Sequence, residues 1–179
     1  MSDQPFTNPN TAAIVDFLRT IGLDVRVEAL PETTFLPGIW IERGALVVDE
    51  ARLRYPGDLL HEAGHLAVAA PERRATITGD AGSDPAEEMM AIAWSYAAAV
   101  QMGLDPAVVF HDDGYQGGGS SIVENFSEGR FFGVPMLQWL GMTVDPAQSG
   151  SRGLEPFPHM LQWLRTVSIP SHEQAEAEV

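Results

Sequence analysis

The spacing of apolar side chains in the first third of the chain predicts one helix followed by three short strands. Apolar residues recur at helical spacing over 11–21, and Gly22 follows as glycines often do at helix ends. Residues 25–29 then alternate between apolar and charged side chains, which indicates a strand with one buried face. Two β-rich runs within 39–49 flank Arg43-Gly44 and predict a hairpin. We therefore expect a small antiparallel sheet.

Two longer helices are predicted after this hairpin. The first begins at Pro56 or Gly57, is largely apolar and is stopped by Pro71. The second, over 85–100, has Asp84 at its N-cap and a proline at its first position. Most of its side chains are apolar on all sides, which is typical of a helix buried on most faces. A polar loop is expected between the two helices.

The first of these helices contains the motif His61-Glu62-Ala63-Gly64-His65. Residues four apart on a helix lie about 40° apart around its axis, so His61 and His65 can present two imidazoles to one metal ion. Glu62 lies beside them, where its carboxylate can accept a proton from a metal-bound water and pass it to a leaving group. The motif predicts a zinc hydrolase. The structural alternative is that both histidines are buried against carboxylates without a metal.

A catalytic zinc site needs a third protein ligand, and the second helix offers Glu87 and Glu88. Glu87 follows the Asp84 cap at the spacing of a capping box, which accounts for it structurally. Glu88 shares a face with the small residues of its helix, and Gly64 in the motif suggests that another helix approaches closely there. We therefore favour Glu88 as the ligand. The alternative is that both glutamates form an acidic first turn that complements the helix dipole.

Composition excludes several other classes of function. The chain has no Cys, which excludes disulfides, thiolate zinc sites and cysteine nucleophiles, and no Lys, which excludes Schiff-base chemistry and a Walker A loop. The net charge of −15 opposes direct binding to nucleic acid. No apolar run is long enough to cross a bilayer, and the N-terminus lacks the features of a signal peptide. We expect a cytoplasmic protein without membrane contact.

The order of these motifs resembles the ImmA/IrrE group of small bacterial zincin-like metallopeptidases. The resemblance covers roughly 36–100 and includes Leu36-Pro37-Gly38-Ile39, the HExGH helix, and Glu88-Met89-Met90-Ala91 followed by Trp94. It also implies proteolysis of a regulatory protein such as a repressor. The resemblance implies a gluzincin-type site in which His61, His65 and a glutamate of the following helix are the zinc ligands. Glu62 would be the general base.

A polar, glycine-rich loop at 111–121 holds further candidates. Either His111 or Tyr115 could donate a hydrogen bond to the oxyanion of a tetrahedral intermediate, a task that two-His-one-Glu zinc sites often share with another residue. His111 together with Asp112 or Asp113 is an alternative second metal site. A plain connecting loop is the structural alternative.

The pentapeptide Met-Leu-Gln-Trp-Leu occurs twice, at 136–140 and 160–164. Each copy comes shortly after a proline and is predicted to form a short amphipathic helix, with 145–155 as a connector between them. Packing in the core is the expected role. The alternative is an exposed apolar surface for a partner, a substrate or a second subunit in a homo-oligomer.

Together these features predict an α+β, zincin-like fold. We expect the antiparallel sheet to pack on the HExxH helix and on the buried third-ligand helix, with short helices at the C-terminus. One domain would span 1–167, beginning with a loose arm at 1–10, and an acidic, disordered tail would follow at 168–179. The predicted function is a Zn²⁺ metallopeptidase acting on a peptide or protein, which the hairpin edge could align by strand addition. The alternative is a non-catalytic, zincin-like regulatory domain that docks a partner through its C-terminal apolar helices.

Overall fold

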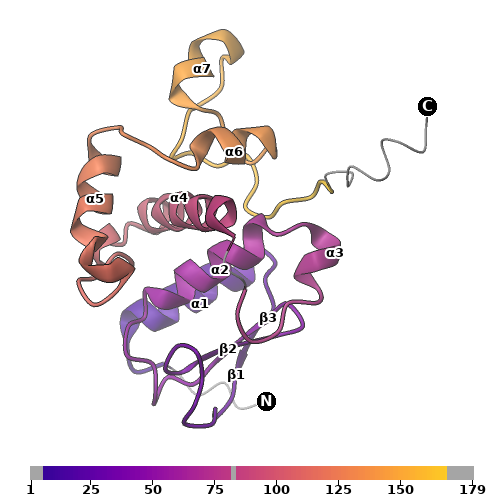
Figure 1. Ribbon diagram of the computed structural model, residues 1–179, viewed down its shortest axis with the longest axis vertical. Helices are drawn as coiled ribbons and strands as arrows, with labels where there is room; N and C mark the ends of the chain where they lie inside the picture. Colours follow the sequence, from indigo (N-terminus) through magenta and orange to yellow (C-terminus); the bar gives the residue numbers. More distant parts are fainter. Residues whose placement is uncertain (1–5, 82–83, 169–179) are drawn as a thin grey trace.

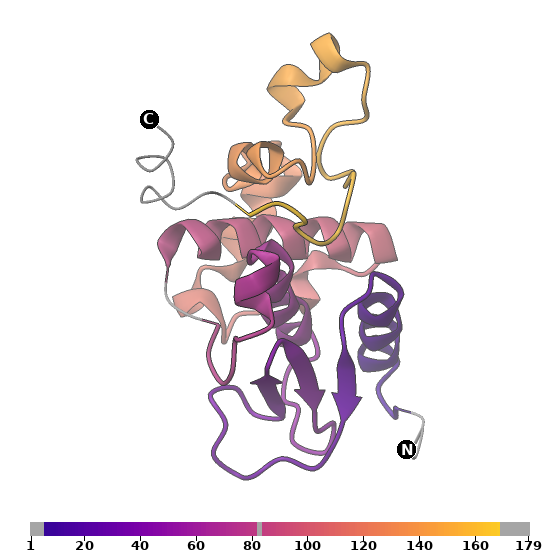
Figure 2. The same cartoon turned by 90° about the vertical axis from the view of Figure 1, so that its right-hand side faces the viewer.

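The computed structural model describes residues 6–81 and 84–168 and has an α+β architecture. The strands are β1 (Val25–Val27), β2 (Ile39–Glu42) and β3 (Ala45–Val48). The helices are α1 (Pro9–Thr20), α2 (Asp58–Val68), α3 (Pro71–Arg74), α4 (Pro85–Met102), α5 (Gly119–Ser127), α6 (Val134–Trp139) and α7 (Pro146–Arg152), with short 3₁₀ turns η1 (Pro106–Val108) and η2 (Tyr115–Gly117). The sheet lies at one end of the molecule and α7 at the other, with α1, α2 and α4 between them (Figures 1 and 2).

The sheet is mixed, so the expectation of a purely antiparallel sheet is wrong. β3 lies in the centre, antiparallel to β2 and parallel to β1. The predicted hairpin is confirmed, since Arg43 and Gly44 form its two-residue turn with φ of 50° and 78°. The chain reverses direction between β1 and β2 and again in the hairpin, so β1 and β3 run the same way. The alternation of apolar residues within a strand does not indicate on which side of a hairpin a further strand pairs.

The contact between α2 and α4 is close because small residues line it on both helices. A Cβ added to Gly64 would lie 2.9 Å from the Ala91 carbonyl oxygen and 3.1 Å from Ser95 Oγ, so a larger residue does not fit without movement. The Ser95 hydroxyl also lies 3.2 Å from the Leu60 carbonyl oxygen of α2. The predicted close approach at Gly64 is therefore confirmed. It brings the first turn of α4 beside the middle of α2.

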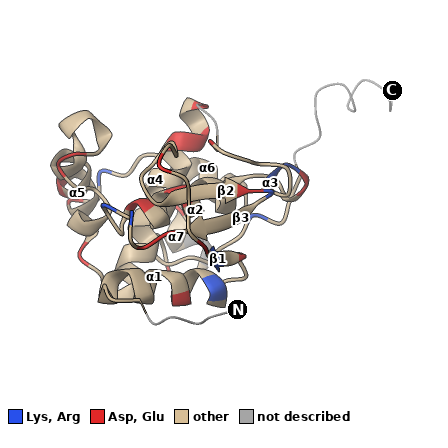
Figure 3. Ribbon diagram, turned by 90° about the horizontal axis from the view of Figure 1, so that it is seen from below, with Lys and Arg blue, Asp and Glu red and all other residues tan. Residues whose placement is uncertain are grey.

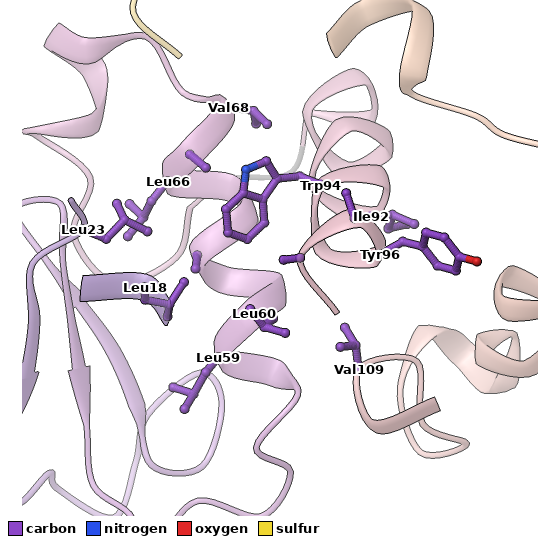
Figure 4. Close-up of a cluster of buried hydrophobic side chains, with 14 of the residues drawn as sticks. Leu18, Leu23, Leu59, Leu60, Leu66, Val68, Ile92, Trp94, Tyr96 and Val109 are labelled. Carbon is purple, nitrogen blue, oxygen red and sulfur yellow. The ribbon is translucent and has the colours of Figure 1, made fainter. Parts of the chain in front are cut away.

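The hydrophobic core covers α4 on both sides, as its largely apolar sequence predicts. Figure 4 shows Trp94 pointing from α4 toward α2, whereas Ile92 and Tyr96 point to the other side of α4. The Trp94 side chain is fully buried, and its Nε1–H donates to the Trp163 carbonyl oxygen at 2.8 Å. Tyr96 packs against Phe126, with ring centroids 4.9 Å apart. The core therefore joins the metal-motif helix to the C-terminal third of the chain.

The two copies of the pentapeptide have different structures. The first copy lies largely in α6, which confirms the predicted helix. The second copy is not helical but forms an irregular strap that crosses α4, so that prediction is wrong. Its Trp163 packs edge-on against Phe17 and Trp94, with centroids 5.0 and 5.6 Å apart. Large aromatic contacts outweigh a short segment's weak helical preference.

Several segments expected to be loops form short helices. Pro71 ends the extension of α2 but also begins α3, a position at which proline is well tolerated. The glycine-rich loop leads into α5, and the predicted connector contains α7, whose N-cap is the Asp145 carboxylate. The predicted arm at 1–10 is wrong for its last residues, because Asn8 caps α1 and its N–H donates to Glu50 at 2.9 Å. The predicted tail lies outside the described residues from 169 onward.

None of the helices in the described part of the chain has the length and apolar character needed to cross a membrane.

Candidate metal centre

His61, His65 and Glu88 form one group between α2 and α4. The Nε2 atoms of the two histidines are 3.2 Å apart, and the Glu88 carboxylate oxygens lie 3.5 Å from His61 Nε2 and 3.1 Å from His65 Nε2. A tetrahedral zinc ion with bonds of about 2.0–2.1 Å needs ligand atoms about 3.3 Å apart. Within 6–81 and 84–168, no other set of three such side chains is suitably placed to hold a metal ion. The predicted choice of Glu88 over Glu87 agrees with this geometry.

Burial and mutual contact determine the ionisation of this group. Burial by itself lowers the pKa of His65, but contacts with Glu87 and Glu88 outweigh it and raise that pKa to about 9. Hydrogen bonds with His61 and His65 hold the pKa of Glu88 well below its usual value. The carboxylate oxygens that favour a proton on His65 would also favour a bound divalent cation. The proton and the cation compete for the same nitrogen of His65.

Glu62 lies beside this group on the wall of the same cavity, with 7% of its surface exposed. Burial raises the pKa of its carboxyl group, and the nearby His61 and His65 partly oppose this effect. A carboxylate with a raised pKa accepts and releases a proton more readily near neutral pH. Its position and environment therefore suit a general base.

The group lies in a cavity of about 530 Å³. Besides the group and Glu62, it is lined by Phe35, Leu36, Asp58, Asp80, Pro85 and Tyr115. The Tyr115 ring stands edge-on to the His61 imidazole, with centroids 5.4 Å apart. Its hydroxyl is buried without a hydrogen-bond partner, and burial raises its pKa well above the usual value, so it remains a donor. A buried hydroxyl of this kind is suited to a polar atom of a bound molecule.

His111 does not line this cavity but a separate one, which it shares with Phe110 and Asp112. Its Nε2 is 2.9 Å from Asp58 Oδ1, and its ring stacks on Tyr55 with centroids 3.8 Å apart. Its partner Asp58 lines the cavity, as Tyr115 does, so Tyr115 is better placed than His111 to donate to a bound molecule. The alternative second metal site around His111 is not formed among the described residues, since Asp113 accepts hydrogen bonds from Arg54 and Tyr55.

Glu87 faces the opposite side of His65 from Glu88. Its Oε1 lies 3.7 Å from His65 Nδ1, and its Oε2 accepts a hydrogen bond from Arg73. The expected capping box is therefore replaced by an ion pair to α3, which carries blue segments in Figure 3. The N-cap role of Asp84 is confirmed by its bond to the Ala86 N–H at 2.8 Å. Nothing in the local sequence marked Arg73, because its contact is with a distant residue.

The edge of β2 beside the cavity is already partly paired. The Ile39 N–H donates to the Leu36 carbonyl oxygen at 3.1 Å, and the Gly79 N–H donates to the Ile41 carbonyl oxygen at 2.8 Å. By the alternation of an antiparallel ladder, Ile39 and Ile41 are the β2 residues whose backbone groups face away from β3, and each forms an antiparallel bridge within the chain, Ile39 to Leu36 and Ile41 to Gly79. The expected addition of a substrate strand at this edge would therefore have to displace Leu36 or Gly79.

No protein-family model, curated protein or solved structure matches the chain. The likeness to the ImmA/IrrE group and the zincin-like description of the fold therefore remain predictions from 36–100. The convergence of the three ligand side chains is a separate observation that depends on neither.

Proposed function

We propose that the protein is a zinc-dependent hydrolase, and specifically a metallopeptidase. The observation that carries the proposal is the convergence of His61, His65 and Glu88 at 3.1–3.5 Å in a cavity, with the buried carboxylate of Glu62 beside them. A zinc ion bound by these three side chains would lower the pKa of a bound water toward ~7 and polarise a substrate carbonyl.

The surrounding residues suit the remaining tasks of peptide hydrolysis. Glu62 accepts the proton of the attacking water and transfers it to the leaving nitrogen. Tyr115 donates a hydrogen bond from its hydroxyl to the oxygen on which negative charge develops. Phe35, which is 68% exposed at the mouth of the cavity, offers an apolar wall to a substrate side chain.

Two substitutions test this proposal. In Glu62→Gln, hydrolysis of a quenched peptide library should fall by about 10²–10⁴-fold while zinc stays bound, because only the proton acceptor is lost. In Glu88→Gln, both zinc and activity should be lost. Metal content by mass spectrometry and cleavage rates are measured on the same preparations. Wild-type protein that binds no zinc, or a Glu62→Gln variant with full activity, would overturn the proposal.

A non-catalytic, zincin-like docking domain is the second candidate, and the exposure of α6 favours it. Trp139 on α6 is 71% exposed, and Leu161 in the strap is 46% exposed. Such exposed apolar side chains are suited to a partner surface. Stoichiometric zinc in a wild-type protein that cleaves no peptide of the library would support this candidate over the peptidase.

A further inference from the structure

We propose that Glu87, held in place by Arg73, positions His65 for metal binding by accepting a hydrogen bond from its Nδ1–H. This inference rests on the proposed metal site at His61, His65 and Glu88. It gives a role to two residues that the ligand set and the general base leave unexplained.

The two nitrogens of His65 face different partners. Nε2 faces the metal-binding group, where His61 Nε2 and Glu88 lie at 3.2 and 3.1 Å. Nδ1 is buried and has no hydrogen-bond partner at normal distance, but Glu87 Oε1 lies 3.7 Å away on that side. An imidazole that binds a metal through Nε2 keeps its proton on Nδ1, so this N–H needs an acceptor. A small movement of either side chain would form the bond with Glu87.

Arg73 explains why a carboxylate can remain on that side of the ring. The Glu87 side chain is only 13% exposed, and a buried carboxylate needs a charged or hydrogen-bonding partner. Arg73 Nη1 donates to Glu87, and Arg73 Nη2 donates to the Ala81 carbonyl oxygen at 2.7 Å. The guanidinium therefore links α3, the segment before α4 and the glutamate that faces His65. The short helix α3 thus has a structural reason for its position.

His61 provides an internal contrast. Its Nδ1 is also buried without a hydrogen-bond partner. The carboxylate that pairs with His61 is that of Glu88, and it lies at the other ring nitrogen, Nε2. Glu87 therefore supports only one of the two imidazoles. Its removal should disturb the ring of His65 and leave that of His61 unchanged, which a general loss of folding would not do.

The test combines zinc affinity with NMR of the zinc-loaded protein. Glu87→Ala should weaken zinc binding by ~10- to 100-fold, the usual effect of losing an outer partner of a ligating histidine. Glu87→Gln retains a weaker acceptor and should give a smaller loss. In ¹⁵N-histidine-labelled wild type, the Nδ1–H of His65 should be shifted downfield and exchange slowly, and this signature should disappear in Glu87→Ala while the ring resonances of His61 stay as in wild type.

Matched controls are available at exposed positions. Glu124→Ala on α5 and Arg130→Ala in the following loop each remove one charge far from the group and should bind zinc as wild type does. Arg73→Ala keeps Glu87 but removes the guanidinium that binds its carboxylate. This variant should weaken zinc binding by several-fold and broaden the His65 signal. This variant decides the question if Glu87→Ala does not fold, as judged by circular dichroism of the zinc-free protein.

The outcomes separate this inference from the metal site itself. If wild type binds one zinc ion and Glu88→Gln does not, but Glu87→Ala and Arg73→Ala match wild type in affinity and in the His65 signal, the positioning role is refuted and the metal site stands. If wild type binds no zinc, both proposals fail. Weaker binding with selective loss of the His65 signature supports the positioning role.

Discussion

The helix pair α2–α4 and the C-terminal segment 134–168 use apolar residues in different ways. In the helix pair, spacing along two regular helices brings together three side chains that could hold a metal ion, and one glycine allows the helices to approach closely. In the C-terminal segment, one pentapeptide yields an exposed Trp139 on α6 and a packed Trp163 in an irregular strap. In a regular helix, the spacing of residues along the sequence determines their relative positions in space. A short segment instead adopts the conformation that its contacts with neighbouring elements stabilise.

The two regions should therefore respond differently to substitution. Changes around the helix pair should alter chemistry and metal binding, and changes in the strap should alter stability without touching the site. The strap nevertheless reaches α2, since Arg165 donates its backbone N–H to the Ala67 carbonyl oxygen at 2.9 Å. Substitutions in either region can therefore test this difference.

Among variants that keep Glu62 and the three candidate metal-binding side chains, Tyr115→Phe should produce the largest change in activity. Removing one donor to a developing oxyanion lowers kcat by about 10²–10³-fold, while zinc content and stability should remain those of wild type. Steady-state rates on a cleaved peptide and metal analysis provide the measurement. Tyr96→Phe, which removes a phenol on the far side of α4, serves as control. Equal rates in Tyr115→Phe and wild type would exclude the donor role.

Trp163→Ala should produce the largest change on the packing side. Loss of its contacts with Phe17 and Trp94 should lower the free energy of unfolding by about 3 kcal/mol, the low end for a buried aromatic residue because Trp163 is half-buried. Trp139→Ala, in the same pentapeptide context but 71% exposed, should change it by less than about 0.5 kcal/mol. Chemical denaturation of both variants measures the contrast. Equal losses would show that the two copies are equivalent.

Gly64→Ala should affect both sides at once. The added methyl group would lie 2.9 Å from the Ala91 carbonyl oxygen, so the helices must separate, at a cost of about 1–3 kcal/mol. Zinc affinity should fall because Glu88 moves away with α4. Gly150→Ala is the control, since a Cβ there meets open space and favours the helix. Unchanged zinc affinity in Gly64→Ala would separate helix spacing from ligand geometry.

The most gradual effect should be a dependence of stability on pH. The pKa of His65 is raised from 6.5 to about 9 in the folded, metal-free protein, so its stabilising contribution is complete below pH 6.5 and is lost as pH rises toward about 9. Denaturation of the metal-free wild-type protein between pH 6 and 10 measures this. Zinc-loaded protein should lack this slope and should release protons on binding zinc below pH 9. A flat profile without metal would contradict the expected ion pairing.

Much of the site followed from the sequence because its elements are long and regular. The spacing of His61 and His65 and the small face that carries Glu88 are properties of single helices, and Gly64 marked where the two helices meet. The partners of Glu87 and the separation of His111 from the cavity were not predictable. Both depend on residues distant in the chain, whose proximity no local pattern records.

The sequence by itself determined which residue types can bind a metal, where the helices that carry them begin, and the hairpin before them. Only the tertiary structure decided that β1 joins the hairpin in parallel, that Arg73 pairs with Glu87 beside His65, and that Tyr115 rather than His111 faces the cavity. The physical reason is that capping, helical periodicity and turn geometry act over a few neighbouring residues. Strand order, ion pairs between distant elements and the shape of a cavity depend on how the whole chain packs.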